Sequence, residues 1–317
     1  MKSTAVVFSR PKELSLQALE LPQVQAGQLE LAVHYSGIST DAERMLWDGS
    51  MSAFPGVGYP LIPGFETVGQ VVKAPQGAKL KEGDMVFVPG ANCFSGIKSM
   101  YGGAASRLVV SDQIVVPVSD LLGVDAVLLA LAATAYHAVS GGGVHEPFTP
   151  PDLIIGHGVM GRLLARLTVA AGCPAPTVWE THAELASGAH GYEVIRPEDD
   201  QRKDYKAVYH MNGDTFNLDY LIQRIRPGGE VVLAGLYKHG LQFSYSPAFS
   251  REARIRVSSE WKRPDLLAVN QLVNSGQLSL KGLVTHVQTF QSANAAYETA
   301  FGDISCLKMV LDWSAHA

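Results

Sequence analysis

One stretch, residues 151–180, constrains the fold of this chain more than any other. It begins with a short apolar run, Leu153 to Ile155, which is typical of a buried parallel strand. A Gly-x-Gly-x-x-Gly sequence follows at once, and a helical pattern of apolar residues continues over about 159–171. A second short strand then ends at Glu180. Strand, glycines, helix, strand and terminal acid in this order predict a dinucleotide site, whereas an isolated glycine sequence would be a weak sign.

The glycines each have a physical role in such a site. Gly156 permits the tight turn out of the strand, Gly158 lets the backbone approach a pyrophosphate, and Gly161 lets helix and strand pack closely. Glu180 lies 24 residues after Gly156, near the spacing for a carboxylate that binds ribose hydroxyls. The alternative is a glycine-rich turn in some other α/β unit. The predicted cofactor-binding residues are Gly156, His157, Gly158, Val159, Met160, Gly161, Glu180 and Gly235.

The composition indicates a globular protein of about two domains. Of the 317 residues, 47% are hydrophobic and 17% are charged. A net charge of −5 gives no basic surface for nucleic acid. The longest apolar run, Ala126 to Ala135, is shorter than the roughly 20 residues of a membrane span. Three scattered cysteines predict no disulfide framework, and the strand-like N-terminus shows no secretory signal, so we expect a cytoplasmic protein.

Secondary-structure patterns divide the chain into three parts and predict the α/β class. Residues 1–120 carry short strand-like runs separated by Gly and Pro, which predicts a small β-barrel-like domain. Residues 121–262 alternate strands and helices, as in a doubly wound parallel sheet. Residues 263–317 are too few to fold alone and are expected to pack back on another domain. The predicted early strands are Thr4–Phe8, Leu29–Tyr35, Val68–Val72, Met85–Val88, Arg107–Val110 and Ile114–Val116. Later we predict helices over 125–139, 216–226, 264–276 and 293–301, and strands over 205–210, 230–234 and 309–311.

This order of parts resembles the medium-chain dehydrogenase/reductase superfamily over essentially the whole chain. The matching motifs are Gly37-Ile38-Ser39, Pro63 to Gly69, Gly83 to Val86 and Arg226 to Gly229. The resemblance implies a GroES-like β-barrel domain over 1–120, a Rossmann NAD-binding domain over 121–262, and a C-terminal segment that returns to the first domain.

Four further stretches look like one branch of that superfamily, which acts in bacteriochlorophyll biosynthesis. They are residues 36–40, 43–47, 54–64 and 306–313, although Asp41 departs from the small residue expected there. This resemblance implies a tetrapyrrole substrate, a (bacterio)chlorophyllide a. It implies oxidation of the 3-(1-hydroxyethyl) group of that substrate to acetyl, with NAD as the hydride acceptor. It is also compatible with a homodimer.

Zinc-dependent members of the superfamily hold their catalytic metal with Cys, His and a second Cys. The matching positions here are Ser39, Phe65 and about Ala130, and only Cys93 lies where a structural zinc lobe would need four cysteines. Phe and Ala cannot ligate zinc and a Ser hydroxyl does so poorly, so we predict no metal. A side chain or a water chain must then remove the hydroxyl proton. The predicted catalytic residues are Ser39, Thr40 and Glu66, with Asp41, His137 and His286 as alternatives.

A flat macrocycle needs a wide apolar cleft with few polar anchors. Trp47, Met51, Phe54 and Tyr59 could line that cleft, or they could simply pack between domains. Two other functions stay open. An NADPH-linked quinone or enone reductase would favour basic residues after the second strand, whereas residues 180–184 are acidic. The second open function is that of a non-enzymatic scaffold or regulator that keeps the cofactor-binding fold, because a fold does not fix a function.

Overall fold

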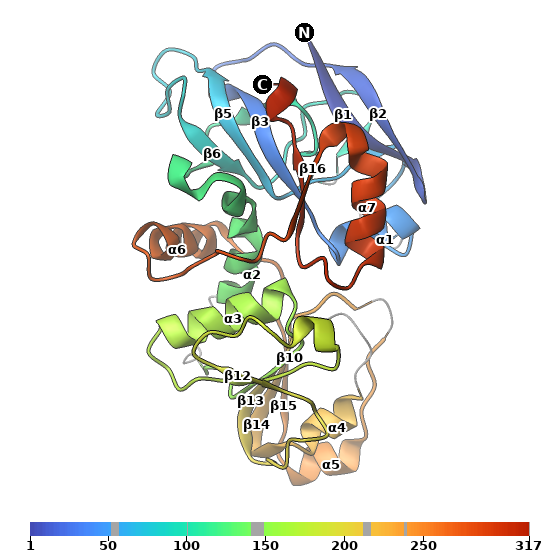
Figure 1. Cartoon of the computed structure of the whole chain (residues 1–317), viewed down its shortest axis with the longest axis vertical. Helices are drawn as coiled ribbons and strands as arrows, with labels where there is room; N and C mark the ends of the chain where they lie inside the picture. Colours follow the sequence, from blue (N-terminus) through green and yellow to red (C-terminus); the bar gives the residue numbers. More distant parts are fainter. Residues whose placement is uncertain (52–56, 100, 141–148, 212–216, 238–239, 317) are drawn as a thin grey trace. The chain divides into compact units, whose positions relative to one another are not determined.

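The computed structural model describes residues 1–51, 57–99, 101–140, 149–211, 217–237 and 240–316 (Figure 1). The chain forms two compact units, of which the first comprises Met1–Ala130 with Leu280–Ala317 and the second comprises Leu131–Ser279. Helix α6 (Arg263–Asn274) thus belongs to the second unit, although the sequence analysis began the returning segment at residue 263. In that unit Asp265 of α6 lies 2.7 Å from the ring nitrogen Nδ1 of His137, which ties α6 to α2 (Leu129–Val139).

The first unit is built from two sheets that contain strands from both ends of the chain (Figure 1). The larger sheet has the order β16-β17-β3-β5-β6-β9, with β8 paired to β3, and the smaller has the order β2-β1-β4-β7. Strand β3 (Gln28–Ile38) is mostly buried, and it pairs with β5 along one edge and with β8 and β17 along the other. The other strands are β1 (Lys2–Arg10), β2 (Glu13–Glu20), β4 (Leu61–Ile62), β5 (Thr67–Lys73), β6 (Met85–Val88), β7 (Lys98–Ser99), β8 (Arg107–Ser111), β9 (Val116–Pro117), β16 (His286–Thr289) and β17 (Met309–Asp312).

The C-terminal segment completes the larger sheet. Strand β17 pairs antiparallel with β3, so that Met309 lies opposite Ile38. The fully buried Trp313 follows, and its Nε1 donates a hydrogen bond to Ser36 Oγ at 2.8 Å. Its ring stacks on Phe290 with centroids 4.9 Å apart. The helices of this unit are α1 (Ala42–Asp48) and α7 (Ala293–Gly302), together with 3-10 segments at 120–128, 290–292 and 314–316.

The second unit holds a six-stranded sheet in which all strands are parallel, with the order β12-β11-β10-β13-β14-β15. This order is that of a doubly wound dinucleotide-binding sheet and confirms the predicted α/β class. Its strands are β10 (Leu153–Ile155), β11 (Thr177–Trp179), β12 (Glu193–Ile195), β13 (Tyr205–His210), β14 (Ile225–Leu233) and β15 (Arg254–Val257). Its helices are α2, α3 (Val159–Ala170), α4 (Leu218–Ile222), α5 (Tyr245–Ser250) and α6.

Some elements differ from those that the sequence predicts. The helix expected over 216–226 is present only as α4, because Ile225 pairs with Tyr205 and already belongs to β14. The strand expected over 114–116 is replaced by β9 at 116–117. Strand β2 was not predicted; none of its residues 13–20 is buried, and polar and apolar residues are equally frequent in it.

The helix expected over 125–139 is also shorter than predicted. It is α2, preceded by a 3-10 segment, Asp120–Leu128, in which Gly123 has a φ of 50° and interrupts the helix. By length and composition the whole stretch Asp120–Val139 could cross a membrane. However, 61% of its most apolar window is buried inside the protein, as is usual for a core helix.

The packing of Trp313 generates a stability prediction. Replacing Trp313 by Ala should lower the free energy of unfolding by about 3–5 kcal/mol, because it leaves a cavity and removes the bond to Ser36. Chemical denaturation measures this loss. Val287→Ala on the neighbouring strand β16 is the control, since Val287 is 48% exposed and its truncation should change stability by no more than about 0.5 kcal/mol. Equal effects of the two substitutions would contradict the assigned packing.

Candidate active site

The glycine sequence forms a loop at the carboxyl end of β10. Gly156 follows the strand directly and has a φ of 98°, in the region that favours glycine. Gly158 is the residue before α3, and no side chain caps that helix. The first N–H groups of α3 therefore remain available to an anion.

The two later glycines differ in what surrounds them. A Cβ at Gly161 would overlap the carbonyl oxygen of Gly156, so only glycine lets α3 lie this close to the end of β10. A Cβ at Gly158 would meet no atom within 4 Å. The space beside Gly158 is thus open, and it fits the pyrophosphate group that the sequence predicts there.

Glu180 follows β11 directly and is only 8% exposed. Its Oε1 accepts hydrogen bonds from the backbone N–H groups of Thr181 and His182, both at 2.8 Å, and its Oε2 accepts one from the His157 backbone at 2.9 Å. Burial alone would raise the pKa of Glu180, but these hydrogen bonds hold the pKa below its usual value. The group is therefore a carboxylate at neutral pH, and Oε2 keeps a lone pair that can accept from a ribose hydroxyl.

The side chain of His157 fixes the glycine loop and does not face a ligand. Its Nδ1 donates to the Leu185 carbonyl at 2.7 Å, and its Nε2 accepts from the Tyr192 hydroxyl at 2.8 Å. Burial lowers the pKa of His157 to about 4, so the ring is neutral. Arg162 reinforces the loop, since its Nε donates to the His157 carbonyl at 2.8 Å. His157 can therefore contribute to a cofactor site only by shaping its backbone.

The predicted cofactor residues gather at one edge of the sheet in the second unit. Parallel strands end at the same edge, so the ends of β10, β11 and β14 bring Gly156, Glu180 and Gly235 together there. Val159 and Met160 begin α3 at this edge. The strand order reverses between β10 and β13, which is the position where sheets of this kind bind ligands.

The predicted catalytic hydroxyls lie in the first unit. Ser39 follows the end of β3 and is 4% exposed, and Thr40 is half-buried in the turn before α1. Asp41, which precedes α1, is exposed. Among the other predicted candidates, the ring of His286 lies in the first unit, 2.9 Å from the Thr285 hydroxyl, while His137 is buried in the second unit against Asp265.

Glu66 is fully buried and is paired with Lys308. The Lys308 ammonium contacts Glu66 Oε2 and donates to the Ile38 carbonyl at 2.9 Å. A Cβ at Gly37 would overlap Glu66 Oε2, so glycine is needed for this pair to form beside β3. Burial raises the pKa of Glu66, and the charge of Lys308 opposes that rise. The pair holds the backbone immediately before Ser39.

A second buried carboxyl, which the sequence did not predict, lies near Glu66. Glu43, in the first turn of α1, has no exposed surface, and the Tyr297 hydroxyl donates to its Oε2 at 2.8 Å. Lys308 was also missed. One signal was available for Glu43, because it lies three residues before the buried Leu46 and therefore on the same helix face.

The three positions matched to zinc ligands hold no metal-binding side chain. The Phe65 ring lies 4.7 Å from the ring of Tyr101, and Ala130 is fully buried. Within the ranges that the structure describes, no group of three or more His, Cys, Asp or Glu side chains could hold a metal ion. The absence of catalytic zinc stays a prediction that rests on Ser39, Phe65 and Ala130.

The aromatic residues suggested for a substrate cleft are engaged within the first unit. The Trp47 ring lies 5.5 Å from that of Phe301, and the Tyr59 hydroxyl donates to the Leu46 carbonyl. Met51 is buried, and Phe54 lies outside the described residues. These contacts agree with ordinary packing of the side chains inside the first unit. A role of these residues in substrate binding stays a prediction.

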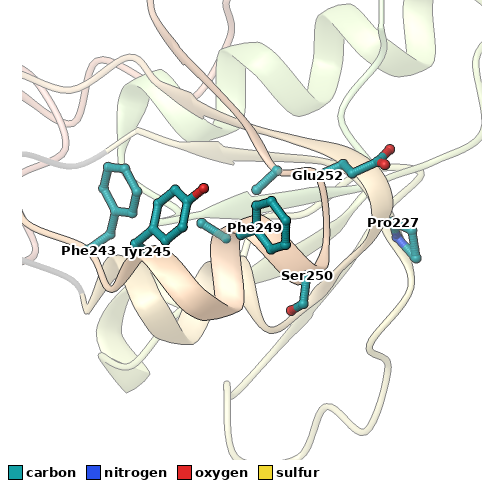
Figure 2. A pocket seen from close by; sticks show the side chains of 8 residues that line it. Pro227, Phe243, Tyr245, Phe249, Ser250 and Glu252 are labelled. Carbon is teal, nitrogen blue, oxygen red and sulfur yellow. The ribbon is translucent and has the colours of Figure 1, made fainter.

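Figure 2 shows a cavity of about 690 Å³ beside α5 in the second unit. Its walls include the exposed rings of Phe243, Tyr245 and Phe249. Pro227 and Ala253 also line it, and they lie near the starts of β14 and β15. The cavity is therefore at the sheet edge opposite the glycine loop, and it is not a candidate for the dinucleotide site.

The contrast between Gly158 and Gly161 generates a matched prediction. Gly158→Val should leave the fold intact but abolish dinucleotide binding, because its side chain would fill the open space at the loop. Gly161→Ala should instead destabilise the second unit, since its Cβ would overlap the Gly156 carbonyl oxygen. Calorimetric titration with NAD and thermal unfolding separate the two effects. Undiminished affinity in folded Gly158→Val protein would place the cofactor elsewhere.

Comparisons with known proteins agree with this geometry. Residues 25–120 match the alcohol dehydrogenase GroES-like domain. The crystal structure of 2R,3R-butanediol dehydrogenase from Bacillus subtilis superposes with a TM-score of 0.81 at 18% identity, covering 98% of this chain and 99% of that one. Acetophenone reductase from Geotrichum candidum, determined in complex with NAD, superposes with a TM-score of 0.82 at 21% identity, covering 98% and 97%. At these identities the likeness shows the fold.

Two relatives are much more similar in sequence. A 2-desacetyl-2-hydroxyethyl bacteriochlorophyllide A dehydrogenase from Cereibacter sphaeroides is 47% identical over 322 residues and covers 100% of both chains. The protein of the same name from Rhodobacter capsulatus is 47% identical over 314 residues and covers 99% of both. With this likeness along its whole length, the chain is a CH–OH oxidoreductase of the medium-chain dehydrogenase type and belongs to the family of the 2-desacetyl-2-hydroxyethyl bacteriochlorophyllide A dehydrogenases.

Proposed function

We propose that this protein oxidises the 3-(1-hydroxyethyl) group of a (bacterio)chlorophyllide a to a 3-acetyl group, with NAD as hydride acceptor and without catalytic zinc. The observation that carries the proposal is the 47% identity to dehydrogenases of that name along the entire chain. The intact glycine loop with Glu180 supports the cofactor assignment, because both parts have the geometry that a dinucleotide needs. We expect the protein to act in the cytoplasm, and a homodimer is compatible with this function.

NAD, when bound, supplies the carbon that accepts the hydride. The open space at Gly158 and the uncapped N-terminus of α3 would hold its pyrophosphate, and Glu180 would accept hydrogen bonds from the adenosine ribose. A 2′-phosphate at that ribose would meet the Glu180 carboxylate, and like charges repel. This argument favours NAD over NADP and weakens the quinone or enone reductase alternative.

Removal of the hydroxyl proton is assigned to the first unit. Ser39 and Thr40 supply hydroxyls at the end of β3 that can pass a proton onward. The Lys308–Glu66 pair acts through them, because Lys308 holds the Ile38 carbonyl and so orients the following residue, Ser39. Glu66 is thereby a positioning residue in this proposal.

Turnover of the natural substrate class tests the proposal. Purified protein with NAD and a 3-(1-hydroxyethyl) chlorin or bacteriochlorin should produce reduced cofactor and the 3-acetyl product. Protein stripped of metal with a chelator should keep full turnover, because Ser39, Phe65 and Ala130 cannot form a zinc site. Elemental analysis accompanies the assay.

Simple secondary alcohols and quinones serve as comparison substrates in the same assay. Reduction of quinones without oxidation of the hydroxyethyl tetrapyrrole would favour the reductase alternative. Absence of any turnover despite NAD binding would favour a scaffold. One zinc per chain, with activity lost on its removal and restored on its return, would contradict the metal-free assignment.

The cofactor preference gives a further prediction. Glu180→Ala should narrow the preference for NAD over NADP by about 1–3 kcal/mol, the scale of a charge-assisted hydrogen bond. Binding of both cofactors to wild type and variant measures it. Glu184→Ala is the control, because Glu184 is exposed in the connection after β11 and should leave the preference unchanged. Equal affinity of the wild type for NAD and NADP would refute this role of Glu180.

A further inference from the structure

Four ionisable side chains form a buried group in the first unit, and the proposed function uses only part of it. They are Glu43, Glu66, Tyr297 and Lys308, each no more than 1% exposed. They come from four separate segments: α1, the residue before β5, α7 and the residue before β17. Only tertiary packing brings them together behind Ser39.

The charges of this group do not balance unless one carboxyl holds a proton. Two carboxyls share one ammonium, and an unbalanced buried charge is costly. Lys308 contacts Glu66 directly, so Glu66 is the carboxylate of the pair. Glu43 has the Tyr297 hydroxyl as its partner, and among the described residues no cation forms an ion pair with it, so the proton belongs on Glu43.

Glu43 also has an unused hydrogen-bonding position on its carboxyl group. Its Oε1 is buried and has no hydrogen-bond partner among the residues that the structure describes. The backbone of Ser39 lies beside this carboxyl. Burial raises the pKa of Glu43 to about 8, and the charge of Glu66 adds to that rise. The Tyr297 hydroxyl, the charge of Lys308 and the Ser39 backbone oppose it. A carboxyl in this state can gain or lose a proton near neutral pH.

We propose that Glu43 is the proton-relay residue behind Ser39, and that Glu66 is a fixed carboxylate held by Lys308. This inference rests on the proposed alcohol oxidation. NAD, when bound, would accept the hydride of the carbinol carbon, and the hydroxyl proton would pass to the Ser39 oxygen. The proton of Ser39 passes to ionised Glu43, which is fully buried and later returns it towards solvent through Ser39, the 4% exposed end of the relay. Glu43 acts through Ser39 and does not touch the substrate.

The pH dependence of hydride transfer tests the relay. Ionised Glu43 is the acceptor, so the oxidation rate in single-turnover measurements should rise about tenfold per pH unit below pH 8 and level off above it. Glu43→Gln should abolish this rise and slow the step by about 10²–10⁴. Tyr297→Phe removes a hydrogen bond that lowers the pKa of Glu43, so it should move the rise to higher pH. Glu298→Gln is the control, because Glu298 is exposed on the same helix as Tyr297. This substitution should alter neither the rate of hydride transfer nor its pH dependence.

Infrared titration of the protein without substrate gives a second readout that does not depend on turnover. The carbonyl band of a protonated carboxyl should disappear as the pH rises through about 8, and it should be absent from Glu43→Gln. The Tyr297→Phe variant keeps the carboxyl, so its shifted band tests the assignment even if Glu43→Gln does not fold.

The two readouts separate the relay from the proposed function. If the band titrates as expected but no hydroxyethyl tetrapyrrole is oxidised, the substrate assignment fails and the proton site stands. A Glu43→Gln variant with the wild-type rate and pH profile would overturn the relay. An unmoved profile and band in Tyr297→Phe would overturn it as well.

Discussion

The pairing of β17 with β3 is the interaction on which the first unit depends. It places the last strand of the chain against residues 35–38, more than 250 positions earlier in the sequence. Just before that strand, the buried Lys308 ammonium donates a hydrogen bond to the Ile38 carbonyl. Just after the strand, the Trp313 ring donates a hydrogen bond to Ser36. Because the pairing fixes both ends, the backbone that leads to Ser39 is held from the C-terminal segment as well as from its own sheet.

In the second unit the corresponding constraint is the close approach of α3 to the loop after β10. A side chain at Gly161 would overlap the Gly156 carbonyl, whereas Gly158 faces open space. The same short sequence therefore contains one glycine required for packing and another that leaves room for a ligand. The hydrogen bonds from His157, Thr181 and His182 to Glu180 then fix the carboxylate at the edge of this space.

Local patterns predicted most of the second unit because its signals are local. A strand, a glycine loop and a helix occupy consecutive residues, so β13 was predicted at its observed bounds and α3 to within one residue. The errors arose where a tertiary contact decides between two local choices. Residues 225–226 continue a helical pattern, but Ile225 gains a strand partner in Tyr205 and joins the sheet. The 3-10 segment before α2 likewise follows from the φ of Gly123, which the apolar composition does not reveal.

By itself, the sequence determined the fold class, the glycine loop after β10 and the lack of zinc-binding side chains at Phe65 and Ala130, because each depends on residue types at fixed local spacing. Only the tertiary structure decided the surroundings of Ser39. Glu43, Glu66, Tyr297 and Lys308 are unremarkable one by one in the sequence, and their chemistry arises from a shared burial that no spacing encodes. Removing water from all four at once makes their charges interdependent, so the protonation of Glu43 is a property of the packed group and not of the residue.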